Sequence, residues 1–100
     1  MARTPIHPGD ILGDELRETG QTAKKLAEVI EVPPNRLYQL VAGKPSMTAD
    51  TALRLSQYFG TSAAFWMNLQ LRWDLYQAQQ SEAKALAMIQ PYPMSVHAVG

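Results

Sequence analysis

Cysteine is absent from the 100 residues of this chain. Disulfide bonds and thiolate metal sites are therefore excluded, and the absence fits a reducing compartment. No apolar run approaches the roughly 20 residues that a membrane-spanning helix needs. The first residues, MARTPIHPGD, have no apolar stretch of the kind found in signal peptides. We therefore expect a cytoplasmic protein that makes no contact with a membrane.

A net charge is absent as well, because nine basic residues balance nine acidic ones. The charges are unevenly placed: residues 10–18 hold four acids and one base, whereas residues 24–54 hold five bases and three acids. Charges on exposed helices mostly serve solvation, so the signal is weak. A neutral total is nevertheless compatible with one locally basic face.

No alternating strand pattern, repeat or low-complexity segment is present, and the 46% of apolar residues is too high for a disordered chain. Prolines, glycines and capping residues instead predict five helices in one all-α domain. Their expected ranges are 8–19, 22–30, 34–43, 48–59 and 62–80. We assign residues 1–80 to this domain and residues 81–100 to a C-terminal extension that is partly disordered.

The second and third predicted helices are short and are joined by a turn of three to four residues, which is helix-turn-helix geometry. The second helix of such a pair lies in the major groove of DNA, where Asn and Gln pair with adenine and Arg with guanine. Asn35, Arg36 and Gln39 lie near the start of the third helix, outside its apolar stripe. We predict that they read bases, and that Tyr38 touches a thymine methyl group or the DNA backbone.

Phosphate contacts need donors at the edge of the same surface. The sequence supplies them near the start of the second helix and just after the third, and we predict this role for Thr22, Lys24, Lys25 and Lys44.

The fifth predicted helix is apolar on two sides. Its second side carries Met67, Leu71 and Leu75, and a chain of this size has little left to cover them. We predict a homodimer through these three residues. The alternative is that residues 83–89 fold back over the same side.

Beyond these patterns, the chain resembles the HigA-type antitoxins of bacterial toxin–antitoxin modules, a branch of the Xre/Cro-like helix-turn-helix superfamily. Four segments carry the resemblance over about residues 6–78. They are HPGDIL at 7–12, the pairs Leu26-Ala27 and Gly43-Lys44 that bracket the helix-turn-helix, TALRL at 51–55, and WMNLQ at 66–70 followed by Asp74-Leu75. Each segment is weak alone, but their order and spacing together are specific.

The resemblance implies a lambda-repressor-like fold and a dimer that represses its own operon by binding palindromic operator DNA. It also implies a partner toxin, a RelE-like ribonuclease that cleaves mRNA. From the residues themselves we predict neither a cofactor nor a metal. In this superfamily the base-reading positions correspond to Pro34, Asn35 and Gln39. The phosphate-binding positions correspond to Ala23, Arg36 and Lys44.

Three departures from the superfamily pattern weaken the predicted DNA surface. Ala23 stands where a phosphate-binding Gln is common, and Pro34 brings no polar side chain to the first reading position. Pro33 and Pro34 also remove two N–H groups that a phosphate would otherwise meet. Glu31 stands where Gly is frequent in the turn, so we expect backbone strain there.

Three other functions are to be compared with this one. An antitoxin that acts only by binding protein fits the prolines and the zero net charge, and a stand-alone transcriptional regulator fits the helix-turn-helix. An enzyme is disfavoured, because no nucleophile–base pair is visible among its candidate residues. These candidates are His7, Asp10, Asp14, Glu15 and His97. The acidic side of the first helix, with Asp14, Glu15 and Glu18, is a candidate surface for a basic toxin.

Overall fold

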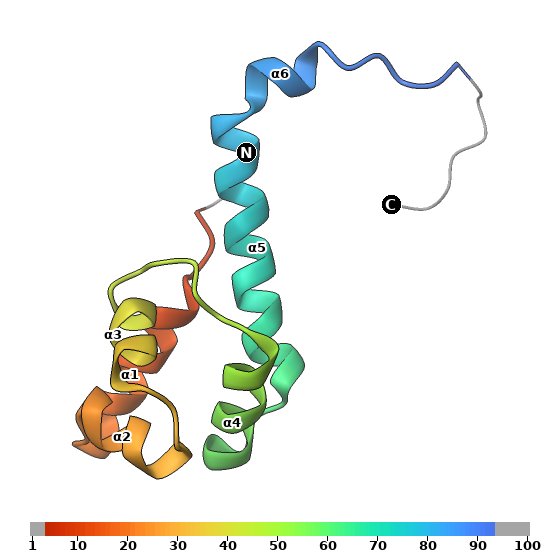
Figure 1. The fold of residues 1–100 in the computed structure, drawn as a ribbon. Helices are drawn as coiled ribbons and strands as arrows, with labels where there is room; N and C mark the ends of the chain where they lie inside the picture. The colour runs from red at the N-terminus through yellow and green to blue at the C-terminus, as the bar shows by residue number, and fades with distance from the viewer. Residues whose placement is uncertain (1–3, 94–100) are drawn as a thin grey trace.

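The computed structural model describes residues 4–93, and this part of the chain contains helices and no strands. The elements are α1 (Pro8–Thr19), α2 (Ala23–Ile30), α3 (Pro34–Val41), α4 (Ala49–Phe59), α5 (Ala63–Ser81) and α6 (Ala83–Ala87). The first four helices and the first half of α5 form a compact group, from which the rest of α5 projects (Figure 1). The molecule is accordingly elongated, with extents of 54 × 24 × 23 Å.

Local capping explains where the helices begin and end. The hydroxyls of Thr22, Thr48 and Ser62 each accept a hydrogen bond from a backbone N–H in the first turn of the helix that follows. Gly20 and Gly60 end α1 and α4 in the left-handed conformation that glycine adopts at no steric cost. These boundaries agree with those predicted from the sequence.

The core lies between α1, α2, α3, α4 and the start of α5. Twelve buried apolar side chains form one cluster: Leu12, Leu16, Leu26, Ala27, Ile30, Val32, Leu37, Leu40, Met47, Ala52, Leu55 and Trp66. Trp66 is its largest member, and its indole N–H donates to the Thr61 hydroxyl over 2.8 Å. Val41, which the apolar pattern of the third helix includes in the core stripe, is instead 40% exposed at the end of α3.

The C-terminal part of the described chain differs from the prediction in two respects. Six helices are present instead of five, because α5 ends at Ser81 and Glu82 leaves helical geometry before α6 begins. The alternative in which residues 83–89 cover the second side of α5 is wrong for this structure. The α6 helix lies at the far end of α5, and Leu86 and Ile89 are 49% and 67% exposed (Figure 1). The remainder of the predicted disordered extension, residues 94–100, lies outside the described residues.

Candidate nucleic-acid interface

The α2–turn–α3 unit has the helix-turn-helix geometry predicted from the sequence. Thr22 caps α2 by accepting from the Lys25 N–H over 3.1 Å. At the other end, Glu31 has φ 62° and ψ 52°, and it is the one non-glycine with positive φ in residues 4–93. Its N–H donates to the Ala27 carbonyl. The expected strain is therefore present, because a side chain in the left-handed region crowds its own backbone.

The start of α3 confirms the effect of the two prolines. Pro33 occupies the cap position and Pro34 the first turn, and no side chain caps the helix. Neither proline carries an N–H. The end of α3 that faces outward thus offers fewer backbone donors than a typical helix N-terminus.

The two sides of α3 differ sharply in exposure. Leu37 and Leu40 are completely buried against the core. Asn35 and Gln39 are exposed, and Tyr38 is 47% exposed beside them. Three of the four side chains predicted to read bases are therefore presented together on the solvent side of one helix.

Arg36, the fourth predicted base-reading residue, points elsewhere. Its guanidinium donates to Asp50 Oδ2 over 2.8 Å, and its side chain is 35% exposed. Asp50 lies on α4, and both of its carboxylate oxygens also accept a hydrogen bond from Arg54 Nε over 3.1 Å. In this structure Arg36 therefore connects α3 to α4 and is not grouped with Asn35 and Gln39.

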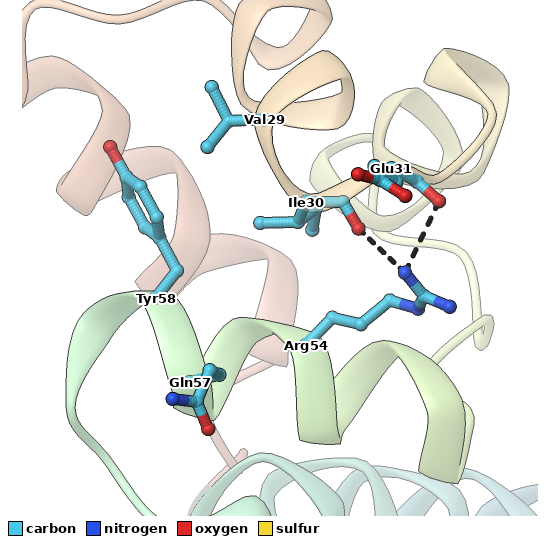
Figure 2. Close-up of a pocket in the computed structure, with 6 residues that line it drawn as sticks. All are labelled: Val29, Ile30, Glu31, Arg54, Gln57 and Tyr58. Atoms are coloured by element: carbon cyan, nitrogen blue, oxygen red, sulfur yellow. Dashed lines mark hydrogen bonds between the residues drawn. The ribbon is translucent and has the colours of Figure 1, made fainter.

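Arg54 extends the same network to the turn between α2 and α3. It lies across a groove of about 410 Å³ formed by the end of α2 and by α4, whose lining residues are shown in Figure 2. Its Nη1 atom donates to the Ile30 carbonyl over 2.8 Å and to the Glu31 carbonyl over 3.4 Å (Figure 2). A cation at the C-terminal end of a helix satisfies carbonyls that lack a partner within the helix and matches the helix dipole.

The ion pairs of this network change the pKa of the Asp50 carboxylate. Hydrogen bonds from Arg54 are the largest influence on it and lower its pKa below the ordinary value of 3.8. Partial desolvation opposes them, and the hydrogen bond from Arg36 acts in the same direction as Arg54. Sequence reasoning missed Asp50 and Arg54 as supports of the turn. The i, i+4 spacing of these two residues was the one available signal.

The predicted phosphate-binding residues lie at the ends of α2 and α3. Thr22, Lys24, Lys25 and Lys44 are all exposed. Lys25 makes a long ion pair of 3.9 Å with Glu28, and both side chains are more than half exposed. Such a pair contributes little and leaves the ammonium group available to an anion.

The three residues predicted to form a dimer interface share one exposed stripe of α5. Met67, Leu71 and Leu75 are 37%, 54% and 54% exposed. The opposite side of the helix carries the buried Trp66 and Gln70, so the stripe faces away from the core.

Of the residues considered for catalysis, the structure describes His7, Asp10, Asp14 and Glu15. His7 is buried and accepts a hydrogen bond from the Gly9 N–H, as an N-cap of α1. Asp10 and Asp14 are exposed on α1. Within residues 4–93 no three His, Asp or Glu side chains cluster to hold a metal ion, and His97 lies outside the described residues. None of the helices described is both long and apolar enough to cross a membrane.

Comparison with known proteins identifies the family. No protein-family model matches the chain. Antitoxin HigA-1 of Vibrio cholerae is 36% identical over 86 residues, which are 82% of this chain and 81% of that protein. An addiction module antidote protein of the HigA family from Coxiella burnetii has a TM-score of 0.82 and 41% identity, over 90% of this chain and 100% of that one.

A second solved structure contains DNA. The Pseudomonas aeruginosa antitoxin HigA, solved with the higBA promoter, has a TM-score of 0.82 and 40% identity, over 87% of this chain and 97% of that one. Sequence, fold and coverage agree with the resemblance found in the sequence. The chain therefore belongs to the HigA-type antitoxins, a family of helix-turn-helix proteins.

Proposed function

We propose that this protein is an antitoxin that binds the operator of its own operon and represses it. The observation that carries the proposal is the two-sided character of α3. Leu37 and Leu40 anchor one side completely, and Asn35, Tyr38 and Gln39 stand exposed on the other. An anchored helix with exposed amide side chains suits readout in the major groove.

In this proposal Asn35 and Gln39 make the base contacts and Tyr38 touches a thymine methyl group or the DNA backbone. Thr22, Lys24, Lys25 and Lys44 bind phosphates and fix the register. Arg36 contacts a base or a phosphate only after its ion pair with Asp50 breaks. The relative solved with its promoter supports DNA as the ligand class.

Operator recognition is proposed to need a dimer formed through Met67, Leu71 and Leu75. A two-fold dimer places two copies of α3 on half-sites about 34 Å apart along the duplex, so the operator is a palindrome.

The second partner in the proposal is a toxin of the RelE-like class, encoded next to this gene. The exposed acidic residues Asp14 and Glu18 on α1, with the half-exposed Glu15, are the proposed docking surface for a basic ribonuclease. The test is co-expression of this protein with the product of the adjacent reading frame. Growth should stop with that product alone and recover with both. A product that leaves growth unchanged when expressed alone would contradict this part of the proposal.

The DNA part is tested by titrating the protein with a duplex taken from directly upstream of its gene, against a random duplex of equal length. Gln39→Ala should lose about 1–3 kcal/mol of binding free energy and relax specificity at one base pair. Lys24→Ala should weaken binding to both duplexes alike and flatten the salt dependence. Gln57→Ala, the same change on the exposed side of α4, is the matched control and should bind as the wild type does.

An antitoxin that acts only through protein contacts is the alternative favoured by Pro33 and Pro34, which deprive the start of α3 of N–H donors. It predicts equal, weak binding to the upstream and random duplexes. A preference of the wild type for the upstream duplex that is lost in Gln39→Ala would exclude it.

A further inference from the structure

We propose that a polar latch made by His7, Gln70 and Asp74 positions Lys44 for contact with a DNA phosphate. The proposal rests on the DNA binding proposed above. Its subject is the segment Gly43–Met47, which follows α3 and has no helical structure of its own. Side chains from the start of α1 and from α5, far from the segment in sequence, hold it in place.

The backbone of Lys44 is fixed on both sides although its side chain is exposed. Its N–H donates to the Gln39 carbonyl over 3.0 Å. Its carbonyl accepts from His7 Nε2 over 3.1 Å and from the Ser46 hydroxyl over 3.2 Å. Because both peptide groups of Lys44 are hydrogen-bonded, the backbone that carries its flexible side chain is already fixed. Less conformational entropy is then lost when the ammonium group binds an anion.

His7 can serve the latch in one protonation form only. Its Nδ1 accepts from the Gly9 N–H over 2.8 Å, so that nitrogen carries no proton. A carbonyl oxygen only accepts, and Nε2 therefore carries the proton and donates to Lys44. His7 is 2% exposed, and its ring packs in a T-shaped arrangement with Trp73 of α5, with 4.9 Å between ring centroids. The imidazole thus joins α1, α5 and the Lys44 segment at one point.

Gln70 holds the other end of the segment. It is 5% exposed, and its Oε1 accepts from the Met47 N–H over 3.1 Å. Its Nε2 donates to Asp74 Oδ1 over 2.8 Å, one turn further along α5. Because the carboxylate only accepts, it orients the amide so that the oxygen faces Met47.

Apolar packing holds only the last residue of the segment, because Met47 is buried in the core whereas Gly43, Lys44 and Pro45 are exposed. An open hollow of about 410 Å³ lies between the segment and α5, lined by Gly43, Pro45, Trp73, Asp74 and Gln77. The hydrogen bond from His7 therefore holds the exposed part of the segment at Lys44, and the hydrogen bond to Gln70 adds to the buried Met47 side chain at its end. The same helix carries the proposed dimer stripe on its other side, so α5 supports the DNA surface as well as the dimer.

The principal variant for the test is His7→Asn, because Asn retains a side-chain acceptor for the cap of α1 and is too short to reach the Lys44 carbonyl. Asp74 is exposed, and Asp74→Ala is a milder change that frees the Gln70 amide without removing a direct hydrogen bond to the segment. Ser62→Ala removes the cap of α5 and controls for a general loss of stability.

The first measurement needs no DNA. Hydrogen–deuterium exchange of the amides in residues 43–47 should speed up in His7→Asn and Asp74→Ala and stay as in the wild type in Ser62→Ala. Unchanged exchange in both latch variants would overturn the latch, whether or not the protein binds an operator.

The second measurement is a double-mutant cycle on binding to the upstream duplex. Loss of one phosphate contact lowers the affinity about eightfold at 0.1 M salt and the salt slope by about 0.9, so a dimer that loses one contact per protomer loses about 60-fold in affinity and about 1.8 in slope. Lys44→Ala should show this loss. His7→Asn should show a loss of at least about threefold with a reduced slope, and little further loss when combined with Lys44→Ala.

The two measurements separate the possible failures. Faster exchange with losses that simply multiply in the cycle would overturn the positioning of Lys44 by the latch. A wild type that prefers no duplex would refute the proposed function instead, and the exchange experiment would still decide whether the latch exists.

Discussion

At the scale of single residues, the close approach of α1 to α3 depends on one glycine. A Cβ atom placed on Gly9 would lie 1.8 Å from the Leu40 carbonyl oxygen, which is backbone and cannot move aside. Gly13, one turn later on the same helix, has the flexible end of Arg17 at 3.6 Å as its nearest contact. The packing therefore requires glycine at position 9 and leaves room for a larger residue at position 13.

We expect Gly9→Ala to lower the free energy of unfolding by about 3 kcal/mol or more, since the helices must separate to admit the methyl group. Gly13→Ala should raise the free energy of unfolding by about 0.5–1 kcal/mol, because alanine is the better helix former. Urea denaturation of the two variants checks both signs. Equal effects would show that α1 and α3 do not pack as described.

Glu31 is the second residue whose backbone conformation leads to a prediction about stability. Its left-handed backbone is costly for any side chain and costs glycine nothing, and the Glu31 side chain is exposed. Glu31→Gly should therefore stabilise the protein, by about 0.5–1 kcal/mol. Thermal denaturation measures it, and a lower melting temperature than that of the wild type would contradict the strain.

At the scale of elements, α4 supports the helix-turn-helix from the side through charged groups. Asp50 accepts hydrogen bonds from Arg36 of α3 and from Arg54 of its own helix. Arg54 in turn donates to a backbone carbonyl at the turn between α2 and α3. The carboxylate is exposed, so the network adds orientation more than stability.

The lowered pKa of Asp50 makes its contribution dependent on pH. A carboxyl whose pKa is lower in the folded protein stabilises the fold above its unfolded value and loses this effect as the pH falls through its folded pKa. The wild type should lose more stability than Asp50→Asn as the pH drops below about 4. Urea denaturation at several pH values between neutrality and acid tests this difference. Parallel curves for the two proteins would contradict the coupling of Asp50 to the arginines.

At the scale of the whole molecule, α5 extends past the core and leaves a long apolar side without cover. The buried residues of α5 are confined to its first half, at Trp66 and Gln70. Exposed apolar side chains continue beyond them, at Leu71 and Leu75 and then at Leu86 past the end of α5. Exposed apolar stripes on small proteins are typical of interfaces, and this one is where we propose the dimer contact.

We expect Leu71→Glu to give a folded monomer with poor affinity for the upstream duplex, because a charge opposite its own copy disrupts a two-fold contact. Leu53→Glu introduces the same charge at another exposed leucine, on α4, and serves as the control. Light scattering gives the mass, and circular dichroism shows whether the variants are folded. If Leu71→Glu kept the mass of a dimer, the α5 interface would be wrong.

The sequence by itself determined the boundaries of α1, α2 and α4, the short turn between α2 and α3, and the exposed position of Asn35, Tyr38 and Gln39, although α3 ends at Val41 and not at the predicted residue 43. These features depend on caps, prolines and apolar spacing, whose effects act within a few residues. It also predicted the exposed stripe of α5, because the second apolar side was visible in the spacing.

Only the tertiary structure decided what Arg36, His7 and Gln70 do. Their partners lie 14, 37 and 23 residues away, at Asp50, Lys44 and Met47. No local pattern specifies such contacts, because they exist only once α1, α4 and α5 have packed around α3. The separate α6 helix and the exposed Val41 were missed for a related reason: chain propensity does not show where a helix leaves the core.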